Sequence, residues 1–147
     1  MKTGVPLFFS ILFILFIASC GRNTDDVDCT NALPEPNWFE IGFVNMDGEP
    51  LIGTVYLQEE FRLFNASSEL MLSSVPFGDP TRLQVGYDDI VSDVDYYIEL
   101  TETDNDTLRF IYSSSMGSCF INYDLQEIIY NGDSYDVGNS SQIDLVK

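Results

Sequence analysis

Residues 96–112 read YYIELTETDNDTLRFIY, and this stretch decides the fold class. In its first half, Tyr96, Ile98 and Leu100 alternate with more polar residues. The second half repeats the same period around Phe110. A period of two places successive side chains on opposite faces of a β-strand. The stretch therefore predicts two neighbouring strands, joined by a polar turn, that each bury one face in a core.

The rest of the chain after the N-terminal region repeats this pattern in short segments. The segments predicted as further strands are Trp38–Val44, 51–58, 61–64, 70–72, 81–87, 119–124, 125–130 and 143–146. Asp47-Gly48 and Asn131-Gly132 lie between apolar runs, and such pairs are typical of tight hairpin turns. No segment carries a long helical period. The pattern predicts an all-β chain, a single antiparallel β-sandwich of roughly seven to nine short strands over residues 38–147.

Two segments carry more specific expectations. In the strand predicted over residues 51–58, Ile52, Val55 and Leu57 are the core candidates. The serine-rich residues 113–118 include a glycine and predict a flexible loop.

Residues 44–55 read VNMDGEPLIGTV, which resembles the opening hairpin of carboxypeptidase-regulatory-like, or transthyretin-like, β-sandwich domains. Those domains often show a strand, an Asp-Gly turn, a Pro-Leu pair, a small residue and a Val. The resemblance implies a sandwich of the Ig-like or transthyretin-like kind, with a hairpin between Trp38–Val44 and residues 51–58. It implies no activity.

The N-terminus has the layout of a secretory signal. Lys2 supplies a positive start, residues 5–17 are almost wholly apolar, and the small residues Ala18 and Ser19 follow. The apolar run is shorter than the roughly 20 residues that span a bilayer comfortably. Residues 1–19 are therefore predicted to be a cleaved signal peptide, with an uncleaved N-terminal anchor as the alternative.

The end of this segment, Ile17-Ala18-Ser19-Cys20, resembles the bacterial lipobox. In lipoproteins with this motif the cysteine thiol receives a diacylglyceryl group, and cleavage makes that cysteine the new N-terminus. The resemblance implies an anchor of two or three acyl chains, of the palmitate kind, on Cys20. Two chains bind a membrane stably where one does not.

The residues after the lipobox resemble those of surface lipoproteins of the Bacteroidota. The acidic run Asp25-Asp26-Val27-Asp28 is similar to their export signal, and the chain as a whole is similar to their small lipoproteins. Residues 20–37 are expected to form a lipidated acidic tether. The resemblance implies a lipoprotein of the cell envelope, in the outer membrane and exposed at the surface.

Two cysteines remain if Cys20 is acylated. An even number in an oxidising compartment predicts a disulfide between Cys29 and Cys119. It would close a loop of about 90 residues. The entropy that such a loop removes from the unfolded chain would stabilise the folded protein by roughly 4–5 kcal/mol. Two separate thiols are the alternative. A structural zinc site is disfavoured, because the chain has no histidine and two cysteines cannot complete one.

The net charge of −18 restricts the partners of this protein. A strongly acidic domain repels phosphate backbones, so nucleic acid is excluded as an expected partner. The charge also fits a solvated surface or a cation-binding surface. The candidate calcium ligands are Asp88, Asp89, Asp93, Asp95, Asp104 and Asp106. Their spacing does not match an EF-hand, so solvated turns are the alternative.

Catalytic motifs are missing from the sequence. Without histidine the chain cannot form a Ser-His-Asp or Cys-His site, and no glycine-rich phosphate loop is present. Carboxylate pairs are abundant, which leaves a small carboxylate-dependent glycan hydrolase as an alternative. No cofactor is expected.

Aromatic residues are the remaining candidates for ligand contact. Trp38, Tyr87, Tyr97, Tyr123, Tyr130 and Tyr135 could stack on glycans or could pack within the sandwich. Trp38 directly follows the tether and is the aromatic most expected to face outward. Asp106-Thr107-Leu108 matches the three-residue pattern for O-glycosylation of secreted Bacteroidota proteins, which makes Thr107 a candidate modification site.

The function expected from the sequence is a non-catalytic binding or accessory module of the cell envelope, anchored to the membrane by acyl chains. Its partner would be an envelope protein or a glycan. A surface glycan-binding or adhesive module is the main alternative. Tethering alone would raise the effective concentration of the domain near such partners.

Overall fold

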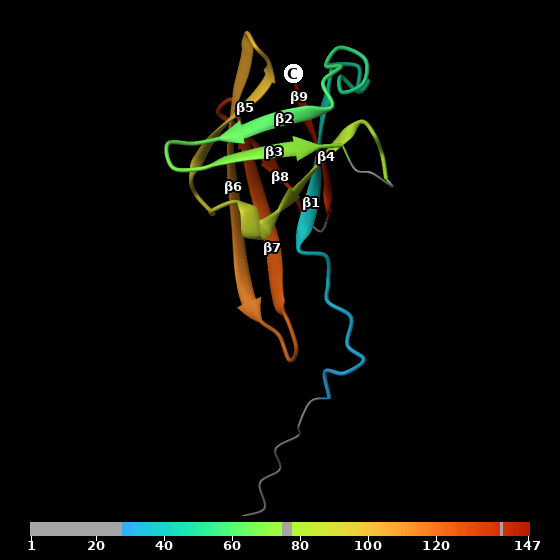
Figure 1. The fold of residues 1–147 in the computed structure, drawn as a ribbon, viewed down its shortest axis with the longest axis vertical. Helices are drawn as coiled ribbons and strands as arrows, with labels where there is room; N and C mark the ends of the chain where they lie inside the picture. Colours follow the sequence, from blue (N-terminus) through green and yellow to red (C-terminus); the bar gives the residue numbers. More distant parts are fainter. Residues whose placement is uncertain (1–27, 75–77, 139) are drawn as a thin grey trace, which may run out of the picture.

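The computed structural model describes residues 28–74, 78–138 and 140–147, which form two facing β-sheets (Figure 1). The predicted signal peptide, Cys20 and the first part of the tether lie outside the described residues. The strands are β1 (Trp38–Val44), β2 (Glu60–Phe64), β3 (Glu69–Ser73), β4 (Arg82–Gly86), β5 (Asp95–Thr101), β6 (Asp104–Met116), β7 (Ile121–Tyr130), β8 (Asp133–Asp136) and β9 (Gln142–Val146). A single 3-10 turn, η1, covers Tyr87–Asp89.

The smaller sheet has the strand order β4-β1-β9 and the larger sheet has the order β3-β2-β5-β6-β7-β8. The prediction of an all-β sandwich is confirmed. Its strands pair antiparallel except at one place, where β1 pairs parallel with β9. Parallel pairing requires a long connection, and here almost the whole domain lies between the two strands.

The core lies between the sheets and follows the period of two that the sequence shows. Phe39, Ile41 and Phe43 of β1 are at most 1% exposed. The ring of Phe39 lies 5.5 Å from the ring of Phe110 in β6, which joins the two sheets. Burying each such side chain contributes about 1.5–3 kcal/mol. The second core face comes from the larger sheet and includes Leu63, Tyr96, Ile98, Leu100, Leu108, Phe110, Ile128 and Tyr130.

The strand predicted over residues 51–58 does not form. An isolated antiparallel bridge joins Val44 to Pro50, after which the chain turns back on itself and Gly53 adopts a φ of +81°. Ile52 is buried as predicted, but Val55 and Leu57 are 62% and 74% exposed. The hairpin implied by the transthyretin-like resemblance is therefore wrong, because β1 pairs with β4 and β9 instead.

The loop predicted over residues 113–118 is also wrong in part. β6 continues through Ser113–Ser115 to Met116, which pairs with Ile121 of β7. β5 pairs with β6 only as far as Arg109, so the outer part of the β6–β7 hairpin is a two-stranded ribbon. Serine hydroxyls do not prevent a strand when both faces of the strand meet water. The polar turn predicted between β5 and β6 is present and short, since Thr101 pairs with Asp104 and only Glu102 and Thr103 lie between them.

The turn predicted at Asn131-Gly132 is confirmed. Tyr130 pairs with Asp133 across it, and the two turn residues have φ values of +50° and +91°. Tight hairpin turns of this kind need positive φ at both central positions, which Asn and Gly adopt at low cost.

The sandwich has two distinct ends (Figure 1). The β6–β7 ribbon and the first described residues lie at one end, which we call the tether end and define as residues 28–37 and 113–123. The loop between β1 and β2 and the C-terminus lie at the opposite end. We call this the C-terminal end and define it as residues 45–59, 102–106 and Lys147.

Candidate functional site

The candidate site surrounds Trp38, the first residue of β1. Because Phe39 faces the core, Trp38 lies on the outer face of the smaller sheet, where it is half-buried. Its partner across the sheet is Gly86 of β4. A Cβ atom on Gly86 would lie 2.5 Å from the Asp89 carboxylate. The glycine therefore allows this carboxylate to approach the strand beside Trp38.

A cluster of stacked tyrosines lies between the site and the core of the sandwich. The ring of Tyr87 lies 4.7 Å from the ring of Tyr123, and the two planes are almost parallel at 3°. Tyr112 meets Tyr87 edge-on at 5.2 Å, and Phe39 lies 5.2 Å from Tyr87 on the core side. Offset and edge-on pairs of this kind add to the stability that burial provides. The stack thus links the core to a half-exposed aromatic surface.

Asp88 fixes the tether and β7 in place at this site. One carboxylate oxygen of Asp88 accepts a hydrogen bond from the Asn37 amide at 2.9 Å, and the other accepts one from the Tyr123 hydroxyl at 2.9 Å. The backbone N–H of Tyr87 also donates to the carbonyl of Asn37 at 2.9 Å. The tether is therefore ordered against the sandwich before β1 begins.

Three hollows in the surface meet at Trp38. The largest, about 600 Å³, lies between the tether and β7 and is lined by Glu35, Trp38, Tyr123 and Asp124, among others. A second, of about 510 Å³, lies towards the ribbon and shares Trp38 and Tyr123. The third, of about 340 Å³, lies towards β3. We call the first two together the Trp38 groove.

The tyrosine hydroxyls of the site are held in their protonated form. Burial, aided by the negative charge of Asp124, raises the pKa of Tyr87 to about 12. The hydrogen bond to Asp88 raises the pKa of Tyr123, and burial raises the pKa of Tyr112. All three are neutral hydrogen-bonding groups at neutral pH. The groove thus offers aromatic faces, hydroxyls and carboxylates together, which is the chemistry of a neutral polar ligand.

The predicted calcium ligands are distributed over three places. Asp88 and Asp89 border the site just described, whereas Asp93 and Asp95 lie beside Arg109. Among the described residues, no group of three or more carboxylates or thiolates lies close enough to hold a metal ion.

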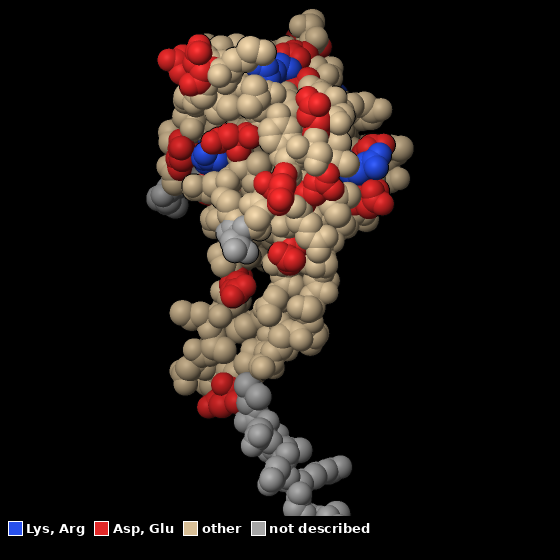
Figure 2. All heavy atoms as spheres, turned by 180° about the vertical axis from the view of Figure 1, so that it is seen from behind, with Lys and Arg blue, Asp and Glu red and all other residues tan. Residues whose placement is uncertain are grey.

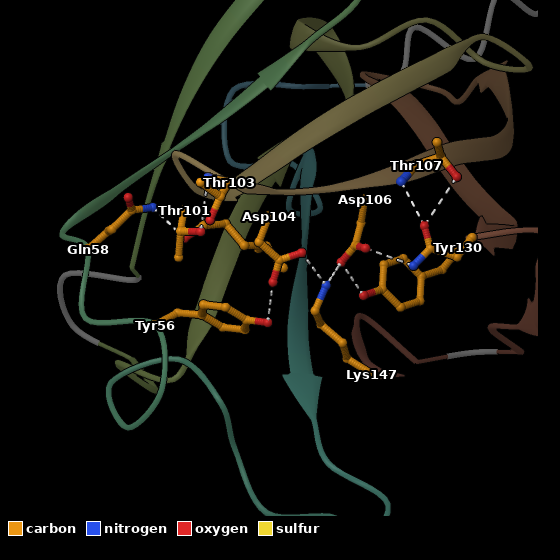
Figure 3. Close-up of polar contacts among 11 residues, drawn as sticks. Tyr56, Gln58, Thr101, Thr103, Asp104, Asp106, Thr107, Tyr130 and Lys147 are labelled. Carbon is orange, nitrogen blue, oxygen red and sulfur yellow. Dashed lines mark hydrogen bonds and ion pairs between the residues drawn. The ribbon is translucent and has the colours of Figure 1, made fainter.

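The remaining two acids belong to a polar network at the C-terminal end (Figure 3). The Lys147 ammonium donates to Asp104 at 2.9 Å and also to Asp106. Tyr56 donates to Asp104 at 3.0 Å, and Tyr130 donates to Asp106 at 2.5 Å. Lysine thus occupies the position that a cation would take between these two carboxylates. The network ties the end of the chain to the larger sheet.

The other predicted aromatics lie away from the groove. Tyr97 is 48% exposed and packs beside Phe64, with ring centres 5.7 Å apart. Tyr130 is buried and Tyr135 packs edge-on against it. Of the six aromatics named from the sequence, the structure therefore brings together Trp38, Tyr87 and Tyr123.

Thr107 lies on an exposed position of β6, where it pairs with Tyr97. Its backbone N–H donates to the side-chain oxygen of Asn131 at 2.9 Å, and its hydroxyl donates to the same atom at 3.3 Å. Glycosylation of Thr107 stays a prediction.

The structure brings together the two cysteines that the sequence analysis paired. The Sγ atoms of Cys29 and Cys119 lie 1.99 Å apart, which is disulfide distance, and the Cα atoms lie 5.5 Å apart. Cys119 lies in the turn of the β6–β7 ribbon. The link therefore fastens the tether to the tip of that ribbon.

Two features, one in the site and one beside it on β1, were not predicted from the sequence. The stack of Tyr87 on Tyr123 joins residues from η1 and β7, and no local pattern predicts such a pair. Glu40 is only 5% exposed and accepts a hydrogen bond from Gln142 at 2.8 Å on the outer face of β1. The alternation in β1 correctly places Glu40 on the outer face of the sheet. The sequence does not show that other residues cover this face, so it does not predict that Glu40 is buried.

The chain was compared with protein-family models, with curated proteins and with solved structures, and none of them matches it. Within the described residues, the chain contains no helix long and apolar enough to cross a membrane.

Proposed function

We propose that this protein is a lipid-anchored envelope protein whose sandwich is a non-catalytic binding module, and that the Trp38 groove binds a glycan. The observation that carries the proposal is the meeting of two hollows at Trp38 and Tyr123, bordered by the carboxylates of Glu35, Asp88 and Asp124. Ligand sites are typically concave and aromatic, with a few polar groups that fix orientation.

The chemistry of a glycan suits this arrangement. One face of a sugar ring carries C–H groups that pack on an aromatic ring, while its hydroxyls donate to carboxylates and accept from tyrosine hydroxyls. A neutral glycan also avoids the repulsion that the net charge of −18 imposes on anionic ligands. The ordered tether contributes Glu35 directly to the groove, so the site depends on the tether as well as on the sandwich.

The membrane anchor in this proposal is supported by the lipobox resemblance at Cys20. The expected mature protein begins with a diacylglyceryl-modified Cys20, followed by the acidic tether. Intact-mass measurement of the protein purified from a Bacteroidota host tests this point. Wild type should carry the mass of two or three acyl chains on a chain that begins at Cys20, and Cys20→Ser should carry none.

A glycan array tests the groove. The mature chain with Cys20→Ser should bind a defined set of glycans, and Trp38→Ala should weaken that binding by roughly tenfold or more, in line with the loss of a central aromatic contact. Tyr97→Ala is the matched control, because it removes a 48% exposed tyrosine that lies outside the groove. Binding that survives Trp38→Ala unchanged would contradict the proposal.

The same experiment separates the other functions. Cleavage of a bound glycan, lost in Asp124→Asn, would replace the binding module with a carboxylate-dependent hydrolase. If no glycan binds, crosslinking on whole cells should be used to look for an envelope protein at the groove. Capture of one defined protein there would assign the chain as an accessory subunit instead.

A further inference from the structure

The tip of the β6–β7 ribbon differs in charge from the rest of this acidic protein. No charged residue occurs between Arg109 and Asp124, and none occurs in residues 29–34 of the tether; Asp28 lies at the margin. Figure 2 shows the tapering end of the molecule mainly in tan, whereas the body above it carries several groups of red spheres. Within the tether end, Asp28 and Glu35 are therefore the only charged residues, and residues 29–34 and 113–123 form an uncharged surface on a chain of net charge −18.

Apolar side chains are exposed on the same end. Met116 is 78% exposed, Ile121 is 49% exposed and Leu33 in the tether is 90% exposed. Serines 113–115 of β6 are also exposed and carry hydroxyls without charge. Apolar groups at a tip, followed by uncharged hydroxyls, match the order of layers in a bilayer surface, where the headgroup region lies above the acyl chains.

Exposed apolar residues also occur at the C-terminal end, but in a different setting. Val55 and Leu57 are 62% and 74% exposed. They belong to a loop that also contains Asp47, Glu49 and Glu59. Charged groups are costly to bring into a lipid surface, so this end is not suited to lipid.

The covalent connection also decides which end lies near the membrane. The disulfide fixes Cys29 to the ribbon tip at Cys119. Eight residues lie between Cys20 and Cys29, and the nine residue steps that join the two cysteines span at most about 30 Å when fully extended. An acyl anchor on Cys20 would thus keep the tip within that distance of the bilayer, while the C-terminal end lies on the far side of the sandwich (Figure 1).

From these observations we infer that the tip of the β6–β7 ribbon, with Met116 and Ile121, docks onto the lipid surface and orients the anchored sandwich. The inference rests on the proposed acyl anchor at Cys20. The acidic body would stay out of the bilayer because its charged groups are costly to remove from water, and the uncharged tip would be the contact. The Trp38 groove would then open close to the membrane, because Phe120 and Ile121 line its ribbon side.

Tryptophan quenching by brominated lipids tests the inference. The full lipidated protein, in a Trp38→Phe background, carries a single tryptophan either as Met116→Trp or as Leu57→Trp. Each protein is reconstituted in neutral phosphatidylcholine vesicles with brominated acyl chains. The two positions have similar exposure, at 78% and 74%, so Leu57→Trp is the matched control.

We expect Met116→Trp to lose about half of its emission or more, as a side chain buried 5–10 Å into the interface would, and Leu57→Trp to lose almost none. Equal quenching at both positions would overturn the inference, because the sandwich would then lie on the membrane without a preferred end. Quenching at neither position, with two or three acyl chains found on Cys20 by intact mass, would also overturn it but leave the anchor standing.

Two further outcomes are distinct. An unmodified Cys20 in the intact mass would overturn the anchor and the inference together, while leaving glycan binding at Trp38 to its own test. A photo-crosslinker at position 116 that captures a protein in whole cells, with no quenching on vesicles, would assign the tip to a protein contact and overturn lipid docking. A product of twice the mass would identify that contact as a second copy of the chain.

Discussion

Different interactions stabilise the two ends of the sandwich. At the C-terminal end, Lys147 lies between the carboxylates of Asp104 and Asp106, and two tyrosine hydroxyls complete the network. At the tether end, residues 110–123 of the ribbon carry no charge, and the Cys29–Cys119 pair joins ribbon and tether.

The difference shows how an acidic chain can use its few cations. The sequence has 24 acidic and 6 basic residues, so cations are scarce and most carboxylates must be solvated by water or by neutral hydrogen-bond donors. One of the cations is used where acids approach a buried position, at Asp106. The link between tether and ribbon needs no cation, because a covalent bond does not depend on charge, and residues 110–123 of the ribbon stay neutral.

The largest expected effect concerns the covalent link. Replacing both cysteines, as Cys29→Ser with Cys119→Ser, should lower the free energy of unfolding by about 4 kcal/mol, because a sequence separation of 90 residues is no longer closed in the unfolded chain. Urea unfolding of the mature chain with Cys20→Ser measures the loss. Ser115→Ala, in the same ribbon, is the control and should unfold like the parent. A loss below about 1 kcal/mol would mean that the link orients the tether without stabilising the sandwich.

The next effect concerns the opposite end. Asp106→Ala should cost about 3 kcal/mol, because it leaves the Lys147 ammonium and the Tyr130 hydroxyl without their partner in a nearly buried place. Asp95→Ala removes an exposed carboxylate beside Arg109 and should cause no measurable loss. Equal losses for the two variants would refute the distinction between the buried network and the surface pairs.

The pH dependence of stability should reflect the same network. Burial alone would raise the pKa of Asp106, but hydrogen bonds from Lys147, Tyr130 and Asn131 outweigh burial and lower it. A carboxyl group with a lowered folded pKa stabilises the fold above its unfolded pKa of about 4. That contribution is lost as pH falls through the lower, folded value.

The lysine of the network acts in the opposite pH range. Burial would lower the pKa of Lys147, but the hydrogen bonds to Asp106 and Asp104 outweigh burial and raise it. Its contribution is fully present below the unfolded pKa of about 10.4 and is lost as pH rises through the folded value. Thermal unfolding from pH 2 to pH 11 should therefore show a loss at both limits. In Asp106→Asn the unfolding temperature should fall less steeply at low pH. An unchanged fall at low pH in that variant would show that Asp106 does not cause it.

The smallest effect is expected at the ribbon tip. Met116→Ser removes an apolar side chain that is 78% exposed, so it should change the free energy of unfolding by less than about 0.5 kcal/mol. Urea unfolding measures this change beside the Asp106→Ala variant. A loss above about 1 kcal/mol would show that Met116 packs within the protein, and would remove the reason to assign it to an external surface.

The sequence was most informative where burial alone determines structure. The alternation around Tyr96, Ile98 and Leu100 predicted β5, and the same residues are 0–2% exposed. The turn at Asn131-Gly132 was also predictable, because few residue pairs tolerate positive φ at both positions. These features depend on local geometry, which is encoded within a few residues.

The sequence was misleading where pairing is decided by distant segments. Residues 51–58 have a suitable pattern for a strand, but the edges of β1 are taken by β4 and β9. The outer part of β6 lacks an apolar pattern because it pairs with β7 outside the core. An apolar pattern in the sequence cannot predict a strand that buries no side chains. It also cannot show that other strands will pair with the edge that a predicted strand would need.

The candidate site was predictable only in part. The position of Trp38 after the tether marked it as outward-facing, and it is half-buried at the edge of three hollows. Its neighbours Tyr87 and Tyr123 were named as aromatics, but their stacking on each other required the fold. Asp88 was considered as a calcium ligand and instead binds Asn37 and Tyr123.

The most direct test of the account is the affinity of the Trp38 groove for a glycan. The best ligand from the array should be titrated into the mature chain with Cys20→Ser, and into the same chain with Trp38→Ala or Tyr97→Ala. We predict that Trp38→Ala raises the dissociation constant by roughly tenfold or more, while Tyr97→Ala leaves it unchanged. An equal dissociation constant for all three proteins, or the absence of any glycan that binds, would contradict the proposed function.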